Sequence, residues 1–424
     1  MSEWAITTLG EVCQKVMTGG TPLSNNEDFY KNGTIPWLRT KEVNFCRIRE
    51  TESYISEQGL ANSAAKVIPP DSVIIAMYGQ GDTAGRVAIN EIPLTTNQAC
   101  CNLVIDKRIA DYNFVYFYLK NSYRELVNAK TGSAQPNLNT QIIKDFPITL
   151  PPLQEQKEIS AVLVSLDRKI ENLRKQNETL EAIAQTLFKH WFVDFEFLNE
   201  DGKPYKSSGG EMVRSELGEM PAGWRVGIFA DLIETIIDNR GKTPPSAESG
   251  IFLIEGNQIF CDNPFPQYAE AGKQKFVSNE TYNNWFRSGH PEHLDILCAT
   301  VGTLPKWCFC PKEEKVCIAQ NIIALRANKT VCTAYWLRLF MNTRYFIESV
   351  IGRLLTTAQP SIKVGHMQSI EALIPDFKIV DRFSSVIKPT VEKSEMNHRQ
   401  IQVLTKTRDM LLPKLMSGKL RITD

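Results

Sequence analysis

Apolar residues recur at alternating intervals of four and three along residues 151–195. The seam positions are Ile159, Leu163, Leu166, Ile170, Leu173, Asn177, Leu180, Ala184, Leu187 and Trp191. Held over four heptads, this spacing predicts one long helix with a coiled-coil seam rather than a broad core-facing stripe. Asn177 is the polar member of the seam, where a buried amide fixes the register of a helix pair at some cost in stability.

A second helical pattern covers about residues 377–416. Phe383, Ile387, Ile401, Leu404, Leu411 and Leu415 fit the same heptad frame, whereas Ser394, Asn397 and Arg408 place polar groups on the seam. Pro389 lacks an N–H donor and is expected to kink or restart this helix. Stripes this narrow do not stabilise isolated helices. The two helices are therefore expected to pack antiparallel on each other, with one globular segment at each end. The alternative is two unrelated helices, each packed on its own domain.

Two globular segments with mixed signals precede these helices. In the first, residues 72–78 and 100–105 are short apolar runs that predict buried strands, and residues 111–129 predict an amphipathic helix. Glycine- and proline-rich loops separate them, including MTGGTPLSNN, YGQGDTAG and TGSAQPNLN.

The chain contains an internal repeat at a nearly constant offset, about 222–224 residues for most matches and 220 for the first. Seven matches occur in the same order, and among them are Trp4–Gly10 with Trp224–Ala230, Asp71–Ala76 with Asp295–Thr300, Gln98–Ile105 with Gln320–Ala327, and Gln135-Pro136 with Gln359-Pro360. Chance does not explain a constant offset over so many matches, so the two halves are expected to share one fold.

The expected fold class is α+β. Two mixed α/β recognition domains, joined by two long helices in an antiparallel coiled coil, form a pseudo-two-fold repeat. The expected boundaries are 1–150 for the first domain, 151–205 for the first helical region, 206–375 for the second domain and 376–424 for the second helical region.

Composition narrows the class of protein. Hydrophobic residues make up 42% of the 424 residues, enough for packed cores. The ten cysteines lack paired spacing, and no run of 18 apolar residues or signal peptide is evident, so a cytoplasmic chain with free thiols and no membrane partner is expected.

Charge counts mildly against nucleic-acid binding, because 48 basic residues balance 48 acidic ones. Residues 1–150 carry 14 basic and 15 acidic side chains, and residues 206–375 carry 17 of each. A DNA-facing surface must then be a local patch, or partner subunits must supply much of the phosphate affinity.

Two similar but non-identical readers, held apart by a stiff helix pair, suit a split DNA site. Major-groove half-sites on one face of a duplex recur about every 34 Å, and a 40-residue helix spans roughly 60 Å. Shape alone also fits a protein scaffold.

Several motifs carry a family resemblance that covers nearly all of the chain. They are W-x(4)-L-G followed by TGGTP (18–22), NGTIPWLRTKEV (32–43), AMYGQ (76–80), PLTTNQA (93–99), SAQPNLN (133–139), LPPLQEQKEI (150–159) with LDRKIENLRKQ after it, and LLPKLMSGKLRI (411–422). In these residues the chain resembles the specificity (S) subunits of type I restriction-modification systems. The second half departs from the pattern at residues 239–242 and 251–258.

The resemblance implies that each recognition domain reads one half of an asymmetric bipartite site in double-stranded DNA. It implies that the helices set the spacer and dock two modification (M) subunits, and that restriction (R) subunits complete the complex. No cofactor is expected on this chain, because S-adenosylmethionine, ATP and Mg belong on the other subunits.

Loop residues whose side chains suit base edges are the candidate DNA contacts. Amides pair bidentately with adenine, and Arg or Lys with guanine. The first-domain candidates are Thr21, Arg39, Lys41, Tyr78, Gln80, Arg86, Gln135 and Asn137. The second-domain candidates are Arg240, Lys242, Asn257, Gln258, Lys306, Gln359 and Lys363. Each is otherwise a turn or solvated residue, and Tyr78 and Trp307 are alternatively core aromatics.

Catalytic and metal motifs are weak. Residues 262–265 (DNPF) lack the second proline of an adenine methyltransferase turn, no P-loop is present, and Glu155-Gln156-Lys157 sits at a helix start rather than on a nuclease strand. Cys308, Cys310 and Cys317 with His290 and His293 do not have a standard zinc-finger spacing. The chain is expected to be non-catalytic by itself.

Three alternatives stay open. The chain could serve a related or orphan methylation system with the same reading role, or be a coiled-coil scaffold for proteins only. It could also be an enzyme in its own right, which methylation or cleavage by the purified chain would establish.

Overall fold

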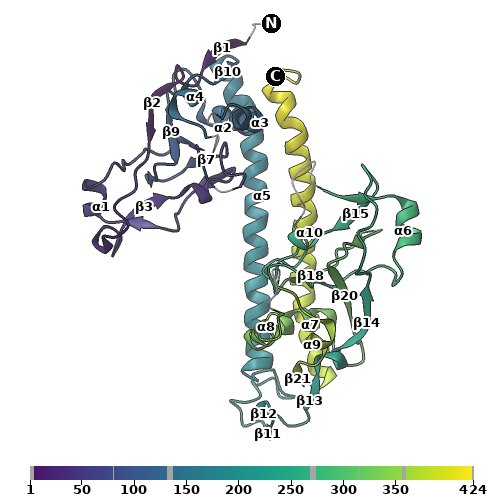
Figure 1. Ribbon diagram of the computed structural model, residues 1–424. Coiled ribbons are helices and arrows are strands. Elements are labelled where there is room, and N and C mark those ends of the chain that lie inside the picture. The colour runs from purple at the N-terminus through teal and green to yellow at the C-terminus, as the bar shows by residue number, and fades with distance from the viewer. Residues whose placement is uncertain are drawn as a thin grey trace. The chain divides into compact units, whose positions relative to one another are not determined.

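The computed structural model describes residues 4–79, 81–130, 137–267, 274–313, 315–355 and 360–422 (Figure 1). The chain divides into two compact units. The first comprises Met1–Arg168 with Thr407–Asp424, and the second comprises Lys169–Lys406. Each unit therefore contains one globular segment and a stretch of both long helices.

The first unit is built on a five-stranded sheet of order β2-β9-β6-β7-β4, with a three-stranded sheet β5-β3-β8 and the pair β1-β10 beside it. Its strands are β1 (Ala5–Thr8), β2 (Cys13–Thr18), β3 (Ile35–Leu38), β4 (Cys46–Ile48), β5 (Tyr54–Ile55), β6 (Val73–Ala76), β7 (Val87–Asn90), β8 (Thr95–Thr96), β9 (Cys100–Ile105) and β10 (Pro147–Leu150). Its short helices are η1 (Glu27–Phe29), η2 (Thr40–Glu42), α1 (Glu57–Ala61), α2 (Tyr112–Asn121), α3 (Tyr123–Asn128) and α4 (Thr140–Lys144). The strands expected at 72–78 and 100–105 are confirmed as β6 and β9.

The single helix expected at residues 111–129 is wrong in one respect. Asp111 caps α2 by accepting a hydrogen bond from the Phe114 N–H, but α2 ends at Asn121, and the backbone of the next residue, Ser122, leaves the helical region. The chain then restarts as α3. The Ser122 side chain makes no capping hydrogen bond here; its modest helix propensity is a local signal that the apolar periodicity masks.

The second unit repeats this architecture. Its sheets have the orders β14-β20-β17-β18, β16-β15-β19 and β13-β21, and a hairpin β11-β12 precedes them. The strands are β11 (Met212–Ser215), β12 (Gly218–Pro221), β13 (Arg225–Ile228), β14 (Ile233–Asp238), β15 (Ile251–Ile254), β16 (Phe276–Val277), β17 (Ile296–Ala299), β18 (Trp307–Phe309), β19 (Cys317–Ile318), β20 (Ile322–Ala327) and β21 (Glu371–Ile374). The helices are η4 (Phe229–Leu232), η5 (Gly256–Gln258), α6 (Asn279–Trp285), α7 (Ala334–Met341), α8 (Arg344–Ile351) and α9 (Val364–Gln368).

The internal repeat is confirmed at the level of strand pairing. Strands β2, β9, β6 and β7 correspond in order and direction to β14, β20, β17 and β18. The parallel pair β3/β8 likewise corresponds to the parallel pair β15/β19, which is otherwise an uncommon arrangement in mostly antiparallel sheets. Strand β4 in the first unit and the hairpin in the second are the additions.

Two long helices complete both units. Helix α5 (Leu153–Phe188) continues into a π-helical turn, η3 (Lys189–Val193), and α10 spans Phe377–Met416. In the first unit Leu163 packs in one core with Leu412 and Leu415, and in the second the Phe188 ring contacts Phe383 at 5.8 Å. Low residue numbers of α5 thus meet high residue numbers of α10, so the helices pack antiparallel, side by side (Figure 1).

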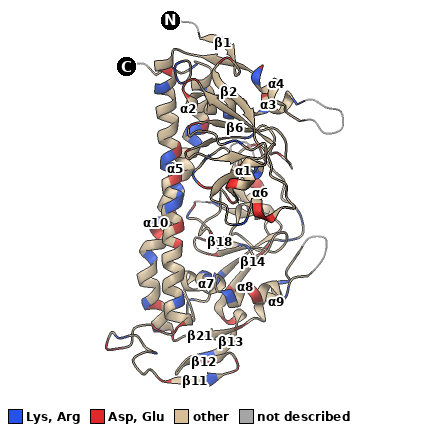
Figure 2. Ribbon diagram, turned by 90° about the vertical axis from the view of Figure 1, so that its left-hand side faces the viewer, with Lys and Arg blue, Asp and Glu red and all other residues tan. Residues whose placement is uncertain are grey.

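Every residue expected on the seam is buried or half-buried. Leu163, Ile170, Leu173 and Ile387 are buried, whereas Leu166, Asn177, Leu180, Leu187, Ile401, Leu404 and Leu411 are half-buried. Lys, Arg, Asp and Glu residues lie along both helices (Figure 2). Of the kink or restart expected at Pro389, the restart is wrong, because α10 is continuous through this residue. Pro389 is exposed, and buried Ile387 and Val391 flank it, so packing on both sides compensates for one missing hydrogen bond.

Polar seam residues pair with each other instead of disrupting the contact. The Asn397 side chain, fully buried, donates to Asn177 Oδ1 at 2.9 Å. The Asn177 amide in turn donates to the Ser394 carbonyl at 3.3 Å. In the first unit Arg408 donates to Asp167 at 2.8 Å. Asn397 and Arg408 therefore find polar partners on α5, whereas the buried Ser394 hydroxyl has no hydrogen-bond partner among the described residues.

Candidate nucleic-acid interface

One edge of the five-stranded sheet carries most of the first-domain candidates. Strand registers place Thr18, Ala76, Val87 and Cys100 at this edge, because Thr18 pairs with Cys101, Ala76 with Cys100, and Ile75 with Val87. The loops 19–23, 77–86 and 97–99 all leave the sheet here. We call this the first loop edge.

Two further segments join the first loop edge. Strand β3 runs parallel to β8, so η2 follows beside residue 97, and the Asn97 N–H donates to the Leu38 carbonyl at 3.0 Å. On the other side, the Leu138 N–H donates to the Met77 carbonyl at 3.0 Å. Candidates from segments far apart in sequence, residues 39–41 and 137 included, therefore gather on one edge.

The described candidates of the first loop edge differ in how free their side chains are. Thr21 is exposed, and its hydroxyl donates to the Gln98 side chain. Arg39 is exposed over the Trp37 ring, 5.3 Å from its centroid. Exposed Lys41 pairs with Glu52. Half-buried Tyr78 packs against the core, where burial raises the pKa of its phenol.

Asn137 is half-buried, and Arg86 is considered below. Gln80 and Gln135 lie outside the described residues. Base contacts by these eight residues stay predictions.

The glycines of the TGGTP motif serve packing rather than contact with a partner. A Cβ at Gly19 would lie 2.1 Å from the Thr96 carbonyl oxygen, and one at Gly20 would lie 2.3 Å from the Ala65 nitrogen. The Trp37 indole N–H also donates to the Gly20 carbonyl at 3.0 Å. Only glycine allows this close approach, so the motif seats the loop that presents Thr21.

The second sheet has an equivalent edge. Asp238, Ala299, Trp307 and Ile322 lie at its strand ends, and the loops 239–250, 300–306 and 319–321 leave from it. The Ile362 N–H donates to the Thr300 carbonyl at 3.0 Å, as Leu138 does to Met77. We call this the second loop edge.

The candidates of the second loop edge also divide into free and engaged side chains. Lys242, Asn257 and Lys363 are exposed. Arg240 donates to Asp238 at 2.7 and 2.9 Å, and these hydrogen bonds lower the pKa of the Asp238 carboxyl. Gln359 lies outside the described residues.

Gln258 has a structural role that its loop position did not reveal. The side chain is only 4% exposed, and its Oε1 accepts a hydrogen bond from the Glu255 N–H at 2.7 Å. Glu42 accepts from the Arg39 N–H in the same way at 2.9 Å. Gln258 therefore caps η5 and does not face outward as a reading residue. Trp307 belongs to the core at 2% exposure, which settles the alternative in favour of packing.

Two residues that hold the first loop edge together were not among the candidates predicted from the sequence. Gln98 is exposed beside Thr21, and the Asn97 amide donates to the Thr40 hydroxyl at 3.1 Å. Both belong to the PLTTNQA run, where an Asn-Gln pair next to a buried strand was the available signal. Gln156 lies outside this edge and was missed as well. It is 1% exposed, and its Oε1 accepts a hydrogen bond from the Asp111 N–H at 2.9 Å, so it clamps α5 to the start of α2, beyond the opposite end of β9.

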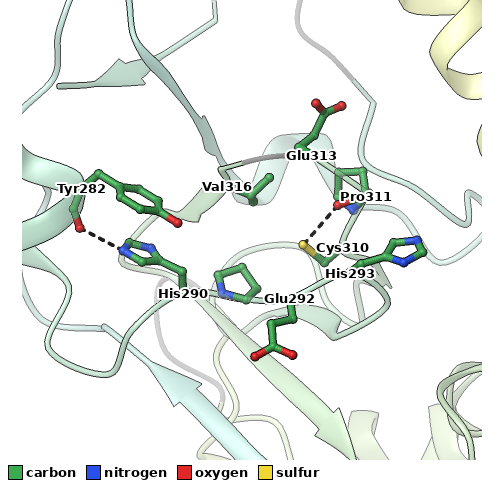
Figure 3. A pocket seen from close by; sticks show the side chains of 9 residues that line it. Tyr282, His290, Glu292, His293, Cys310, Pro311, Glu313 and Val316 are labelled. Atoms are coloured by element: carbon green, nitrogen blue, oxygen red, sulfur yellow. Dashed lines mark hydrogen bonds between the residues drawn. The ribbon is translucent and has the colours of Figure 1, made fainter. Parts of the chain in front are cut away.

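The residues that raised the question of zinc do not form a metal centre among the residues that the structure describes. His290, His293 and Cys310 line a cavity of about 290 Å³ (Figure 3). The His290 ring stacks on Tyr282 with centroids 3.6 Å apart, and His293 reaches Glu395 at 3.2 Å. Cys308 and Cys317 are buried, and burial raises the pKa of Cys317 to about 12. All ten cysteines are free.

Comparison with known proteins shows what the chain is similar to. Residues 1–182 match the family model described as "Type I restriction modification DNA specificity domain". The MjaIX type I specificity subunit of Methanocaldococcus jannaschii is 28% identical over 440 residues, covering 100% of this chain and 94% of the relative. The EcoR124I/EcoR124II specificity subunit of Escherichia coli is 29% identical over 168 residues, 39% of this chain and 41% of the relative.

A solved structure shares the fold. The S subunit of a type I restriction-modification system from M. genitalium aligns with a TM-score of 0.54 and 15% identity, covering 97% of this chain and 96% of that one. By the family model, residues 1–182 are similar to type I DNA specificity domains. The predicted resemblance of the chain to the specificity subunits of type I restriction-modification enzymes is confirmed. No helix in the described part of the chain is long and apolar enough to cross a bilayer.

Proposed function

We propose that this chain is the DNA specificity subunit of a type I restriction-modification complex and reads an asymmetric, split site in double-stranded DNA. One observation carries the proposal: a single recognition fold occurs twice, with the same strand order and the same loop-bearing edge but different loop side chains. Because loops carry recognition while the scaffold positions them, two equal scaffolds with unequal loops suit two different half-sites.

We assign to the helix pair the role of setting the distance between the two half-sites. Each globular segment shares a core with stretches of both α5 and α10, as Ile159 and Leu415 do in the first unit and Ala184 and Phe383 in the second. A recognition fold that is packed on helices is held in a fixed orientation on them. The outer faces of these helices are further proposed to dock two methyltransferase (M) subunits, and restriction (R) subunits join through that assembly.

Recognition is the contribution of this chain, and the bond-making steps belong to its partners. The partners would supply S-adenosylmethionine, ATP and Mg. They would also supply part of the phosphate affinity, since the chain carries no net positive charge. Ten free thiols suit a reducing compartment, so we place the complex in the cytoplasm.

The proposal is tested with the full-length chain assembled with the methyltransferase subunits of its host. Methylated adenines are mapped across the genome, and the deduced site is then used as a labelled duplex in a binding titration. We expect one motif with two unlike halves and a constant gap, bound more tightly than random duplex. A continuous motif would contradict a split site, and absence of duplex binding would favour a protein scaffold.

A further inference from the structure

Arg86 and Lys306 occupy the same position in the two repeats. Each immediately precedes the strand that pairs with the central β6 or β17. The Ala76 N–H donates to the Arg86 carbonyl at 2.9 Å, and the Ala299 N–H donates to the Lys306 carbonyl at 3.0 Å. The two cations therefore stand at equivalent points of the first and second loop edges.

The same neighbouring position supports both cations. Arg86 Nη1 donates to Asn44 Oδ1 at 3.0 Å, and Nε donates to the Asp82 carbonyl. Lys306 Nζ lies 4.9 Å from the centroid of the Phe260 ring. Asn44 and Phe260 each stand two residues after the short helix η2 or η5. The cation is retained while the chemistry of its support differs.

Neither cation is neutralised by a carboxylate among the described residues. This distinguishes them from Lys41, which pairs with Glu52, and from Arg240, which pairs with Asp238 at 2.7 Å. Arg86 and Lys306 are half-buried, which limits the side-chain freedom that a bound anion would have to restrict. Each loop edge thus holds a positioned, half-buried cation that has no carboxylate partner among the described residues.

Adjacent positions on the two edges do not share their chemistry. Arg39 and Glu255 are equivalent, because each is the residue before η2 or η5 and donates its N–H to the side chain three residues later, at 2.9 and 2.7 Å. Yet one is a cation and the other an acid that pairs with Lys275. Lys41 likewise corresponds to Asn257.

Side chains that both repeats share are suited to the phosphate backbone, which is the same in every duplex. Side chains that differ between the repeats are suited to reading the base sequence. Phosphate contacts position a protein on the duplex, whereas base contacts specify the sequence. We propose that Arg86 and Lys306 each bind a backbone phosphate of their own half-site, and that residues 39–41 and 255–257 face base edges. This inference rests on the proposed function and assigns roles within it.

The test measures salt dependence and sequence discrimination separately. The full-length chain, assembled with its methyltransferase subunits, is titrated against a duplex with the mapped site and a random duplex over a range of KCl concentrations. Lys306→Gln keeps a polar side chain near Phe260 but removes the charge. This substitution should weaken binding to both duplexes by the same factor. It should also reduce the slope of log K against log salt by about 0.9, the value for one phosphate.

Arg86→Gln should behave alike, and Lys306→Arg should restore the slope. The matched control is Lys329→Gln, an exposed lysine without an ion pair in the described chain, which follows β20 at the opposite end of that strand. It should change neither quantity. Arg39→Gln should instead alter discrimination at the first half-site only.

If Lys306→Gln keeps the wild-type melting temperature and the wild-type salt slope, the phosphate contact is overturned. The proposed function still stands in that case, provided that the wild-type complex prefers its mapped site over random duplex. A loss confined to the specific duplex would make Lys306 a base reader and overturns the phosphate contact as well. Failure of the wild-type complex to prefer its site over random duplex would instead overturn the proposed function.

Discussion

Arg338 and Glu181 form a buried ion pair that ties α7 to α5 in the second unit. Their side chains are 1% and 9% exposed, and Arg338 Nη1 donates to the two Glu181 oxygens at 3.0 and 2.9 Å. Arg338 Nη2 also donates to the Cys261 carbonyl at 3.0 Å, and the Asn342 amide donates to Glu181 Oε1 at 3.2 Å. Arg338→Met would leave the carboxylate buried without its cation.

The expected cost follows from desolvation. Removing one partner of a buried ion pair typically costs about 3–5 kcal/mol, because the remaining charge keeps its desolvation penalty and loses its attraction. For a unit of this size that corresponds to a fall of roughly 10 °C in melting temperature. Because Asn342 also accepts from the Trp307 indole N–H at 2.6 Å, tryptophan fluorescence should report the loss.

The measurement is a double-mutant cycle of thermal and urea unfolding. Arg338→Met and Glu181→Met should each destabilise the second unit strongly, whereas the double variant should recover much of the loss as an apolar contact. Arg344→Met is the control, because its pair with Glu348 is exposed to solvent and contributes little to stability. A double variant as unstable as the sum of the single variants would refute the pairing argument, as would equal effects of Arg338→Met and Arg344→Met.

Three further variants probe a buried histidine, the polar pair between the long helices and a closely packed glycine. Burial lowers the pKa of His398 to about 4 from an ordinary 6.5, so the stability due to its neutral ring is complete above pH 6.5 and is lost as the pH falls toward 4; His398→Gln should flatten this part of a urea-unfolding pH profile. Asn397→Leu should destabilise the helix pair by about 1–3 kcal/mol by leaving the Asn177 oxygen without its donor, and adding Asn177→Leu should restore thermal stability. Gly20→Ala should lower the melting temperature through a clash worth about 1–3 kcal/mol, whereas Gly365→Ala, with open space around it, should be neutral; equal effects would show that the close approach at Gly20 does not matter.

The long helix α5 and the repeated fold were predictable, because each produces a pattern that recurs along the sequence. The heptad spacing from Ile159 onward predicts α5, and the ordered matches at constant offset predict two copies of one fold. Both signals add over many residues, so local exceptions such as Pro389 do not remove them. The wrong predictions concern local structure. Helix α10 continues through Pro389, and Ser122 separates α2 from α3 where the apolar periodicity predicts a single helix.

The loop edges were only partly predictable because their side chains depend on neighbours distant in sequence. Gln258 and Asn257 look equally suitable in the sequence, yet the first is buried as a cap and the second is exposed. Arg240 and Lys306 both read as free cations, but only Arg240 meets a carboxylate. Hydrogen-bond partners of this kind follow from strand pairing, which a single sequence does not specify residue by residue.

In the proposed function, each globular segment reads its own half of the DNA site. The most direct measurement replaces residues 1–150 with the matching segment of a relative whose site is known, and maps methylated adenines in cells that carry the chimaera. We expect one half of the motif to change to that of the donor while the other half and the gap stay the same. A motif that changes in both halves, or in neither, would contradict it.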